Sequence, residues 1–390
     1  MDGVKRILPS GDVSGVKDRV ELEKAFDDNS ITVVELTGTY WINGPLTCQP
    51  KTITGLGQPI HTAWPSEVYT GARIRCVGTW TKTNYALTLL GAVIHNAWIG
   101  VAWKCRGVRQ SSRYAMESAS NLFIDSPSQI GYDLVDNWGS RLAGIFILRP
   151  RGIAMRLHRA NSLQIDTLRI NHGYLFRNVN PALNEVTWRT ACEFGQAAAE
   201  AIPGYATDWP SPDDQTVKDM YGNIVATPVE DRAALVVGSQ EHSIDLVTFR
   251  NVLFEPIHAG EYPTVVLRGT NLTFDTVRFE GGYHRDTLFQ VANTQPVGPN
   301  HWRAVNNQIR NAFVVAVNTD WARPAYVARA VNSSHNLVLD GITAKHYLKS
   351  AILACDGGTH YAPSVRNVYK SPGVQDIVAL NGASIQANVI

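Results

Sequence analysis

The stretch Leu163-Gln-Ile-Asp-Thr-Leu-Arg-Ile170 decides the fold, because its alternation of apolar and polar residues recurs later in the chain. The copies are Val247-Thr-Phe-Arg-Asn-Val-Leu-Phe254, Leu272-Thr-Phe-Asp-Thr-Val-Arg-Phe279 and Leu337-Val-Leu-Asp-Gly-Ile-Thr-Ala344. Each copy reads apolar, any, apolar, polar, any, apolar, any, apolar. Alternation places side chains on opposite faces of a strand, and the phase change after the polar position requires a bend. Each copy is therefore predicted to form a short strand, a tight bend and a second short strand.

Looser copies extend this pattern toward the N-terminus and fill the gap between the last two strict copies. They are Ile94–Ile99, Leu122–Asp125 and Ile309–Val314. The intervals between the third positions of successive copies vary from 25 to 84 residues. A solenoid tolerates such variation, because each turn stacks on the previous one and loops of any length leave at the corners. A β-sandwich has no reason to repeat one template in this way, so the sequence predicts a β-solenoid.

Four acids occupy the polar position of the template and are expected at the bends: Asp125, Asp166, Asp275 and Asp340. An Asp side chain can bond its own neighbouring backbone and tolerates unusual φ. We therefore interpret these acids as corner residues and not as catalytic groups.

The composition is that of a folded globular protein, with 390 residues, 44% hydrophobic side chains and 18% charged side chains. A net charge of +1 without any Lys/Arg run argues against nucleic-acid binding. The chain has no apolar stretch long enough to span a membrane and no secretory signal at its N-terminus, so neither is expected. The five cysteines are scattered without a CxxC pair, which predicts reduced, buried thiols. We expect no metal and no cofactor.

The first part of the chain predicts one amphipathic helix within residues 10–28, capped by Ser14, followed almost entirely by strands. We divide the chain into an N-terminal segment, residues 1–60, and a solenoid, residues 61–390. Within the solenoid, residues 181–238 contain small-residue, Pro/Asp and Tyr-Gly-Asn stretches and are predicted to be a protruding insertion with its own hairpin.

The N-terminal segment also carries a family resemblance. Its Gly11-Asp12, Gly15, Asp18, Leu22 and Ala25, followed by Gly38-Thr39-Tyr40, Ile42, Pro45-Leu46, Ile53 and Gly55-Leu56-Gly57, resemble the capping segment of pectate-lyase-like β-helix proteins. Such segments are frequent in phage tail spikes and in polysaccharide-degrading enzymes. The resemblance implies an all-β, single-stranded right-handed parallel β-helix with an N-terminal capping α-helix. The helix would cover the first open strand edge.

The chain also departs from the enzymes of this family. Of the polygalacturonase series only Asn318-Thr319-Asp320 is present, without the later elements, and no clustered Asp set for calcium is found. The stretch before the cap is too short for the virion-binding domain of many tail spikes, which leaves three alternatives: attachment through another tail protein, attachment through the C-terminus, or no attachment to a virion.

One pair of acids emerges from aligning the repeats. Glu255 follows Phe254 and Glu280 follows Phe279, one copy apart, so inward phenylalanines would leave both acids facing solvent. Adjacent strands lie about 4.8 Å apart, close to the separation of roughly 5 Å between the carboxyls of retaining glycosidases. Repulsion between two stacked carboxylates would favour a proton on one of them. The pair is therefore a candidate for glycosidic hydrolysis.

Further polar residues follow these acids. His258 and Glu261 lie on the neighbouring turn, and Tyr283, His284, Arg285 and Asp286 come directly after Glu280. We expect Glu255, Glu280, Asp286 and His284 in catalysis, and Tyr283 and Arg285 in substrate binding. A lyase would instead use His284 or Tyr283 as base and Arg285 to neutralise a uronate. In the structural alternative, both acids are solvated, paired with Arg278 or Arg285, or buried between subunits.

Two tryptophans beside acids are further candidates for sugar contact. Trp209 follows Asp208, and Trp321 follows Asp320. An aromatic face beside a carboxylate offers a sugar ring both C–H contact and hydroxyl acceptors. Trp209, Asp320 and Trp321 are therefore expected in substrate binding, whereas Trp41, Trp98 and Trp103 lie in strand pattern and are expected to be structural.

The expectation that joins these observations is a phage tail-spike or minor tail protein that binds host cell-surface polysaccharide and, if enzymatic, hydrolyses it. The resemblance implies a homotrimer, other phage tail proteins as partners, and a location in the virion. A non-enzymatic structural or adhesive tail component and a cellular polysaccharide lyase or hydrolase remain alternatives.

Overall fold

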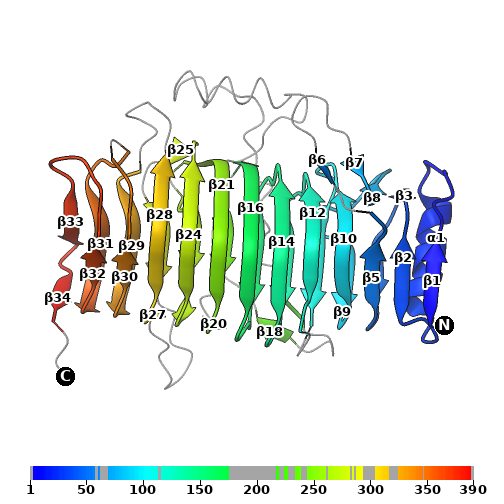
Figure 1. The fold of residues 1–390 in the computed structure, drawn as a ribbon, viewed down its shortest axis with the longest axis horizontal. Coiled ribbons are helices and arrows are strands. Elements are labelled where there is room, and N and C mark those ends of the chain that lie inside the picture. Colours follow the sequence, from blue (N-terminus) through cyan, green and yellow to red (C-terminus); the bar gives the residue numbers. More distant parts are fainter. Residues whose placement is uncertain are drawn as a thin grey trace.

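The computed structural model describes residues 3–57, 60–61, 69–112, 116–174, 217–218, 224–226, 233–238, 244–260, 262–281, 283–284, 287–292, 304–315, 324–345 and 347–387. The strands stand side by side along the long axis, with the two termini at opposite ends (Figure 1). All pairings along the long sheets are parallel, so the chain winds as a parallel β-helix. Its crossovers are right-handed, as parallel crossovers are. The fold predicted from the repeats is confirmed.

The first long sheet carries the repeat template. Its strands, in spatial order, are β1 (Val4–Ile7), β2 (Val33–Leu36), β5 (Thr52–Gly55), β10 (Val93–Gly100), β12 (Ala119–Asp125), β14 (Arg141–Leu148), β16 (Gln164–Tyr174), β21 (Thr248–Gly260), β24 (Thr273–Glu280), β28 (Gln308–Val315), β30 (Val338–Asp340) and β32 (Ser364–Arg366). Three further strands join it at the side, namely β3 (Thr39–Ile42), β8 (Ala72–Cys76) and β25 (Tyr283–His284).

The second long sheet closes the other side of each turn. Its strands, in spatial order, are β20 (Ile244–Asp245), β23 (Gly269–Thr270), β27 (Ala304–Val305), β29 (Tyr326–His335), β26 (Thr287–Ala292), β22 (Val265–Leu267), β19 (Leu235–Val237), β15 (Ile153–His158), β13 (Ile130–Val135), β11 (Arg106–Ser111), β9 (Tyr85–Leu90) and β4 (Leu46–Cys48). At its C-terminal end β31 (Ala351–Tyr361) pairs with β29, β33 (Gln375–Leu380) and β34 (Ser384–Gln386).

The register places equivalent template positions on top of one another. Ile165 pairs with Phe249, Phe249 with Phe274, and Phe274 with Ile309. These side chains are buried between the sheets, and the rings of Phe249 and Phe274 stack 4.3 Å apart. The apolar positions of the repeat therefore form the continuous core.

The bend falls one residue after the predicted acids. The residues that follow the polar position, Thr167, Asn251, Thr276, Asn311 and Gly341, all have φ between 52° and 68°. This left-handed conformation redirects the strand, so Asp166, Asp275 and Asp340 lie next to the bend and not in it. Asn and Gly adopt such φ values most readily.

The placement of Asp125 was wrong. Ile124 pairs with Ile99 and Ile147, which are last positions of the template, and Ile94 pairs instead with Ala119. Asp125 therefore ends its strand, where Arg149 binds it at 2.7 Å. The short match Leu122–Asp125 fits either half of the template, because alternation has a period of two residues.

The helix α1 (Val16–Asp27) covers the N-terminal end of the core with Leu22, Ala25 and Phe26. Its start differs from the prediction. Gly15 takes the N-cap position, Asp12 accepts hydrogen bonds from the backbone of Ser14 (3.0 Å) and Lys17 (3.0 Å), and Ser14 Oγ accepts a longer one from the backbone of Val16 (3.4 Å). Among the described helices, none is long and apolar enough to cross a membrane.

Two short antiparallel pairs complete the described elements. The strands β6 (Ile60–His61) and β7 (Tyr69–Thr70) form one pair, and β17 (Val217–Lys218) and β18 (Ile224–Ala226) form the other. The second pair flanks residues 221–223, where a hairpin was predicted. The predicted insertion extends too far at its C-terminal end, because β19 belongs to the second long sheet.

Candidate functional site

Glu255 and Glu280 lie at corresponding ends of β21 and β24. Phe254 and Phe279 pair in register, are 1% and 2% exposed, and stack with ring centroids 4.9 Å apart. The next residue on each strand must point to the other face, and the Glu255 and Glu280 side chains are 33% and 26% exposed. The inward phenylalanines and outward acids follow the prediction.

Both carboxylates are held by arginines. Arg169 donates to Glu255 at 2.7 Å and to Asn171 Oδ1 at 3.0 Å. Arg278, two residues before Glu280 on the same strand, forms an ion pair with it. The alternative in which Glu280 pairs with Arg278 is therefore realised. These bonds orient both acids as hydrogen-bond acceptors.

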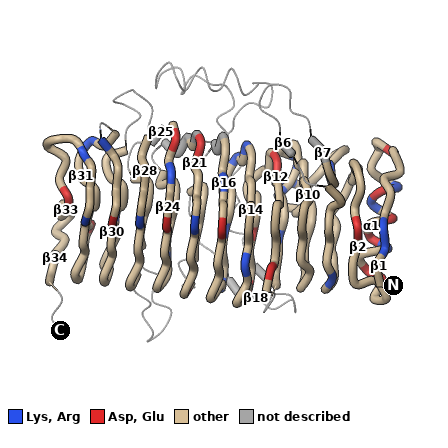
Figure 2. The backbone as a smooth tube through the Cα atoms, viewed as in Figure 1, with Lys and Arg blue, Asp and Glu red and all other residues tan. Residues whose placement is uncertain are grey.

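An exposed aromatic ring lies beside these ion pairs. The outward position occupied by Arg278 is occupied by Phe313 on β28, and the two residues pair in register. Phe313 is 45% exposed, and Val315, opposite Glu280, is 40% exposed. We name Arg169, Glu255, Arg278, Glu280 and Phe313 the glutamate face. Figure 2 shows acidic and basic positions together along this part of the first sheet.

Phe313 was missed by the sequence reasoning, although a signal was present. The seventh template position points outward, and an aromatic residue there is exposed unless something covers it. Trp98 and Phe123 occupy the same position on β10 and β12 but are only 1% and 8% exposed, and their rings stack 4.9 Å apart. Phe313 therefore differs from Trp98 and Phe123 in burial, although all three occupy the same position of the sequence template.

Strand extensions bring further predicted residues toward the glutamate face. The strands β16 and β21 continue beyond the repeat template, and Gly173 pairs with Ile257 in this extension. The strand β25 pairs with this extension, with Tyr283 opposite His258 and His284 opposite Gly260. The backbone of β25 thus lies beside the end of β21, and the roles of Tyr283 and His284 stay predictions.

The remaining predicted site residues lie outside the described residues. They are Trp209, Glu261, Arg285, Asp286, Asp320 and Trp321. Their roles in catalysis and substrate binding stay predictions. Trp103, expected to be structural, donates from its indole nitrogen to the backbone of Arg149 at 2.9 Å, and Arg151 lies over its ring at 4.0 Å.

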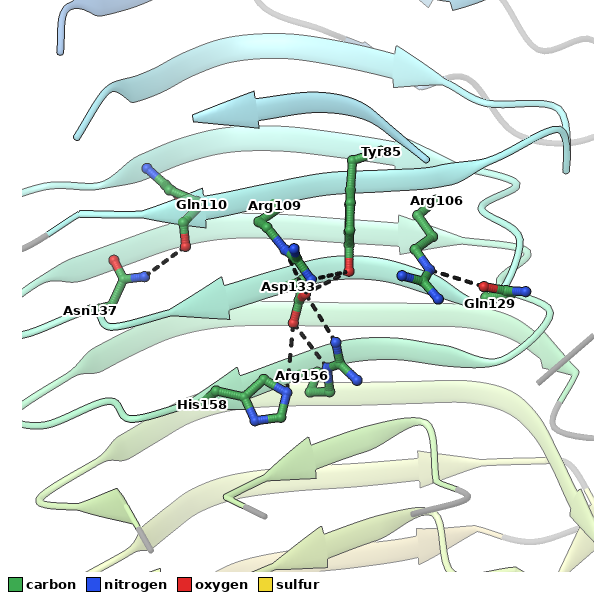
Figure 3. Close-up of polar contacts among 9 residues, drawn as sticks. All are labelled: Tyr85, Arg106, Arg109, Gln110, Gln129, Asp133, Asn137, Arg156 and His158. Carbon is green, nitrogen blue, oxygen red and sulfur yellow. Dashed lines mark hydrogen bonds and ion pairs between the residues drawn. The ribbon is translucent and has the colours of Figure 1, made fainter. Parts of the chain in front are cut away.

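A second polar cluster, not anticipated from the sequence, lies on the second sheet. Arg109, Asp133 and Arg156 pair in register on β11, β13 and β15 (Figure 3). Asp133 is fully buried and accepts hydrogen bonds from Arg109 (2.9 Å) and Arg156 (2.9 Å). The Tyr85 hydroxyl donates to it at 2.5 Å, and His158 Nε2 lies 3.9 Å away. We name Tyr85, Arg106, Arg109, Asp133 and Arg156 the arginine cluster.

The electrostatics of this cluster follow from burial and charge. Burial opposes ionisation of Asp133, but Arg156 and Arg109 outweigh it and hold the pKa of the carboxyl well below its usual range. Burial likewise works against the charged form of Arg156, yet the charge of Asp133 raises its pKa overall. The signal in the sequence was a charged residue at the same outward position of consecutive strands, which becomes visible only once the register is known.

The cysteines in the described part of the chain are free thiols, and its His, Cys, Asp and Glu side chains form no candidate metal site. Cys48, Cys76, Cys105 and Cys355 are free and buried, and burial raises the pKa of Cys48 to about 12. Cys76 and Cys105 approach with their sulfurs 3.9 Å apart. Across the described ranges, no group of three His, Cys, Asp or Glu side chains is arranged to hold a metal ion.

The fold defines a parallel β-helix protein, and the outward charged and aromatic residues of the glutamate face are a candidate site on its surface. No protein-family model matches the sequence, and a search of curated proteins finds no significant match. A comparison with solved structures finds matches that cover nearly the whole chain.

Three of these structures illustrate the likeness. ORF18 of Geobacillus virus E2 has 10% identity, a TM-score of 0.49, and coverage of 97% of this chain and 58% of its own. The Dettilon tailspike protein has 10% identity, a TM-score of 0.49, and coverage of 99% and 68%. The endo-xylogalacturonan hydrolase from Aspergillus tubingensis has 11% identity, a TM-score of 0.48, and coverage of 98% and 100%. The chain thus spans 58% of the first of these proteins.

Proposed function

We propose that this chain binds host cell-surface polysaccharide through the glutamate face, as a phage tail-spike or minor tail protein. The observation that carries the proposal is the exposed ring of Phe313 in register with Arg278, which is paired with Glu280. A sugar ring stacks its apolar C–H face on an aromatic side chain, while its hydroxyls bond to carboxylates and guanidinium groups. The glutamate face offers all three partners on adjacent strands.

The binding test compares three variants on a glycan array and then by titration with the best glycan. Phe313→Ala removes the ring and is expected to weaken binding about tenfold, or about 1.4 kcal/mol. Glu280→Gln keeps the shape but removes the charge, and it should weaken binding as well. Glu35→Gln is the matched control, because the Arg6–Glu35 pair lies on the first sheet but far along the axis. Equal binding by all three variants would overturn the proposal.

Hydrolysis of the bound glycan is the extension of this proposal. Glu255 and Glu280 lie on neighbouring strands, which supports a two-carboxylate mechanism of the retaining type. One of them must then donate a proton, so glycan binding must weaken its ion pair with arginine. Glu280→Gln is expected to abolish release of reducing ends while circular dichroism stays unchanged. Undiminished turnover in this variant would exclude the pair as the catalytic site.

A non-enzymatic adhesive protein is the second candidate, and the ion pairs favour it. Arg169 and Arg278 orient both carboxylates as acceptors, and Glu280 is paired within its own strand. Such an arrangement suits binding without requiring a proton donor. Binding of a glycan by the wild type, without release of reducing ends, would establish this candidate over the hydrolase.

The oligomeric state and location of the protein are the last part of the proposal. We propose a homotrimer with parallel axes, located in the phage tail with other tail proteins as partners. Light scattering of the purified chain is expected to give three times the mass of 42.9 kDa. A stable monomer would count against the trimer without affecting the glycan-binding test, because the glutamate face lies within one chain.

A further inference from the structure

The buried side chains of the arginine cluster carry more positive than negative charge. It contains the guanidinium groups of Arg106, Arg109 and Arg156 but only the carboxylate of Asp133 (Figure 3). Arg106 and Arg156 are 3% and 2% exposed, and Asp133 is 0% exposed. Buried charges are expensive unless they are paired. Two of the three positive charges therefore have no compensating carboxylate within the cluster.

The nearest described groups do not remove this excess. Gln129, which accepts from Arg106 Nε at 2.9 Å, is a neutral amide. Asp136 is buried and lies 3.7 Å from Arg159, which brings a positive charge of its own. His158 adds positive charge whenever it is protonated. Among the described residues, the excess is thus shared by several side chains and does not belong to one of them.

Arg106 also has an unused donor. Its Nη2 is buried and has no hydrogen-bond partner in the part of the chain that the structure describes. The guanidinium groups of Arg106 and Arg109 lie over the ring of Tyr85, 5.4 Å and 4.3 Å from its centroid. The Arg109 side chain is 19% exposed, so the cluster reaches solvent on that side.

We propose that the arginine cluster binds a small oxyanion through Arg106 and Arg109. Guanidinium groups present parallel N–H donors that match the oxygens of sulfate, phosphate or a carboxylate. A bound oxyanion would satisfy Arg106 Nη2 and compensate the excess charge at the same time. It would also link β9, β11, β13 and β15, the strands that contribute to the cluster. The proposal does not depend on glycan binding at the glutamate face.

Calorimetric titration and thermal unfolding test the proposal with sulfate, phosphate and glucuronate as separate probes at constant ionic strength. The wild type is expected to bind at least one probe saturably and to gain Tm with its concentration, because ligands of the native state stabilise it. Arg106→Gln should lose at least tenfold in affinity and most of the Tm response. Binding of glucuronate alone identifies a sugar acid as the ligand, whereas binding of sulfate or phosphate identifies an inorganic anion.

The matched control is Arg141→Gln, which removes an arginine from the exposed Arg141–Asp166 pair on the first sheet. It should keep the full response to each probe. Equal responses of the Arg106 variant and the wild type, or no saturable binding by the wild type, would overturn the proposal. A selenate soak of wild-type crystals gives an independent answer if Arg106→Gln does not fold. An anomalous peak at Arg106 and Arg109 supports the site, and its absence refutes it.

Discussion

At the scale of single residues, Asp133 shows how one buried carboxylate organises its surroundings. Two arginines and a tyrosine hydroxyl converge on it, and Arg156, which is 2% exposed, would otherwise be a buried charge without a carboxylate partner. Removing one partner of a buried ion pair leaves the other charge uncompensated, which costs more than the pair itself contributes. Asp133 is therefore more important to the fold than an acid on a strand surface would be.

Replacement of Asp133 by Asn is expected to lower the free energy of unfolding by about 3–5 kcal/mol, measured by urea denaturation. The matched control is Asp166→Asn, whose partner Arg141 is mostly exposed, and which should cost less than about 1 kcal/mol. Because the folded-state pKa of Asp133 is lowered, its contribution is present above the unfolded value of about 4 and is lost as pH falls through the folded value. A cost equal to that of the control would contradict this role.

His360 is the basis of a second prediction at the scale of residues, which concerns how stability changes with pH below about 6.5. Burial lowers the pKa of His360, which lies 3.0 Å from Ser334 Oγ and 2.8 Å from the carbonyl oxygen of Gly357. Between this lowered value and the unfolded value of about 6.5, the unfolded chain binds more protons. Stability should therefore rise with pH through that window. His360→Gln is expected to reduce this rise of the free energy of unfolding with pH, measured by urea denaturation at several pH values. His95→Gln should reduce the rise only by the contribution of His95 itself.

At the scale of elements, α1 closes the end of the core that would otherwise be open. Asp18 is buried and accepts from the backbone of Ser10 (2.7 Å) and Trp41 (2.8 Å), which ties the helix to its flanking segments. Phe26 is fully buried beneath it. The helix thus combines an apolar contact with polar anchors, and both protect the first strands from pairing with other chains.

Phe26→Ala is expected to destabilise the protein by about 3–5 kcal/mol, since it leaves a cavity under the helix. It should also promote aggregation, because a loosened cap exposes the first strand edge. Val20→Ala is the control within the same helix, because Val20 is 39% exposed. Urea denaturation and light scattering report the two effects. Similar losses in both variants would show that the cap contributes by helix propensity and not by burial.

At the scale of the whole molecule, stability should vary along the axis. Every side chain of β13 is buried, whereas those of β33 and β34, on the last coil, are exposed or only partly buried. Each coil of a solenoid is stabilised mainly by its neighbours, and the last coil has a neighbour on one side only. Local opening should therefore be easiest at the C-terminal end.

Amide hydrogen exchange followed by mass spectrometry checks this gradient. Peptides covering β33 and β34 are expected to exchange much faster than those covering β13 and β15, because exchange requires opening of the strands. Peptides of β1 and β2 serve as the internal comparison, because α1 covers their end of the core. Uniform exchange along the axis would contradict the gradient and indicate a single cooperative unit.

Prediction from sequence succeeded where one local pattern carried the information. The alternation in residues 163–170 predicts both the inward Ile165 and the bend before Leu168, because side-chain direction along a strand is a local property. It failed for Asp125, where four residues fit two registers equally well. It also missed the arginine cluster, because Arg109 and Arg156 lie 24 and 23 residues from Asp133 in the sequence and meet it only through strand pairing.

The sequence by itself determined the β-helix, the capping helix and the outward direction of Glu255 and Glu280, because these depend on periodicity and on residue types within short stretches. Only the tertiary structure decided which outward residues became neighbours and which were covered. It pairs the two glutamates with Arg169 and Arg278, leaves Phe313 exposed, buries Trp98, and brings Arg109 and Arg156 onto Asp133. The physical reason is that register between coils depends on loop lengths and packing, which no single repeat encodes.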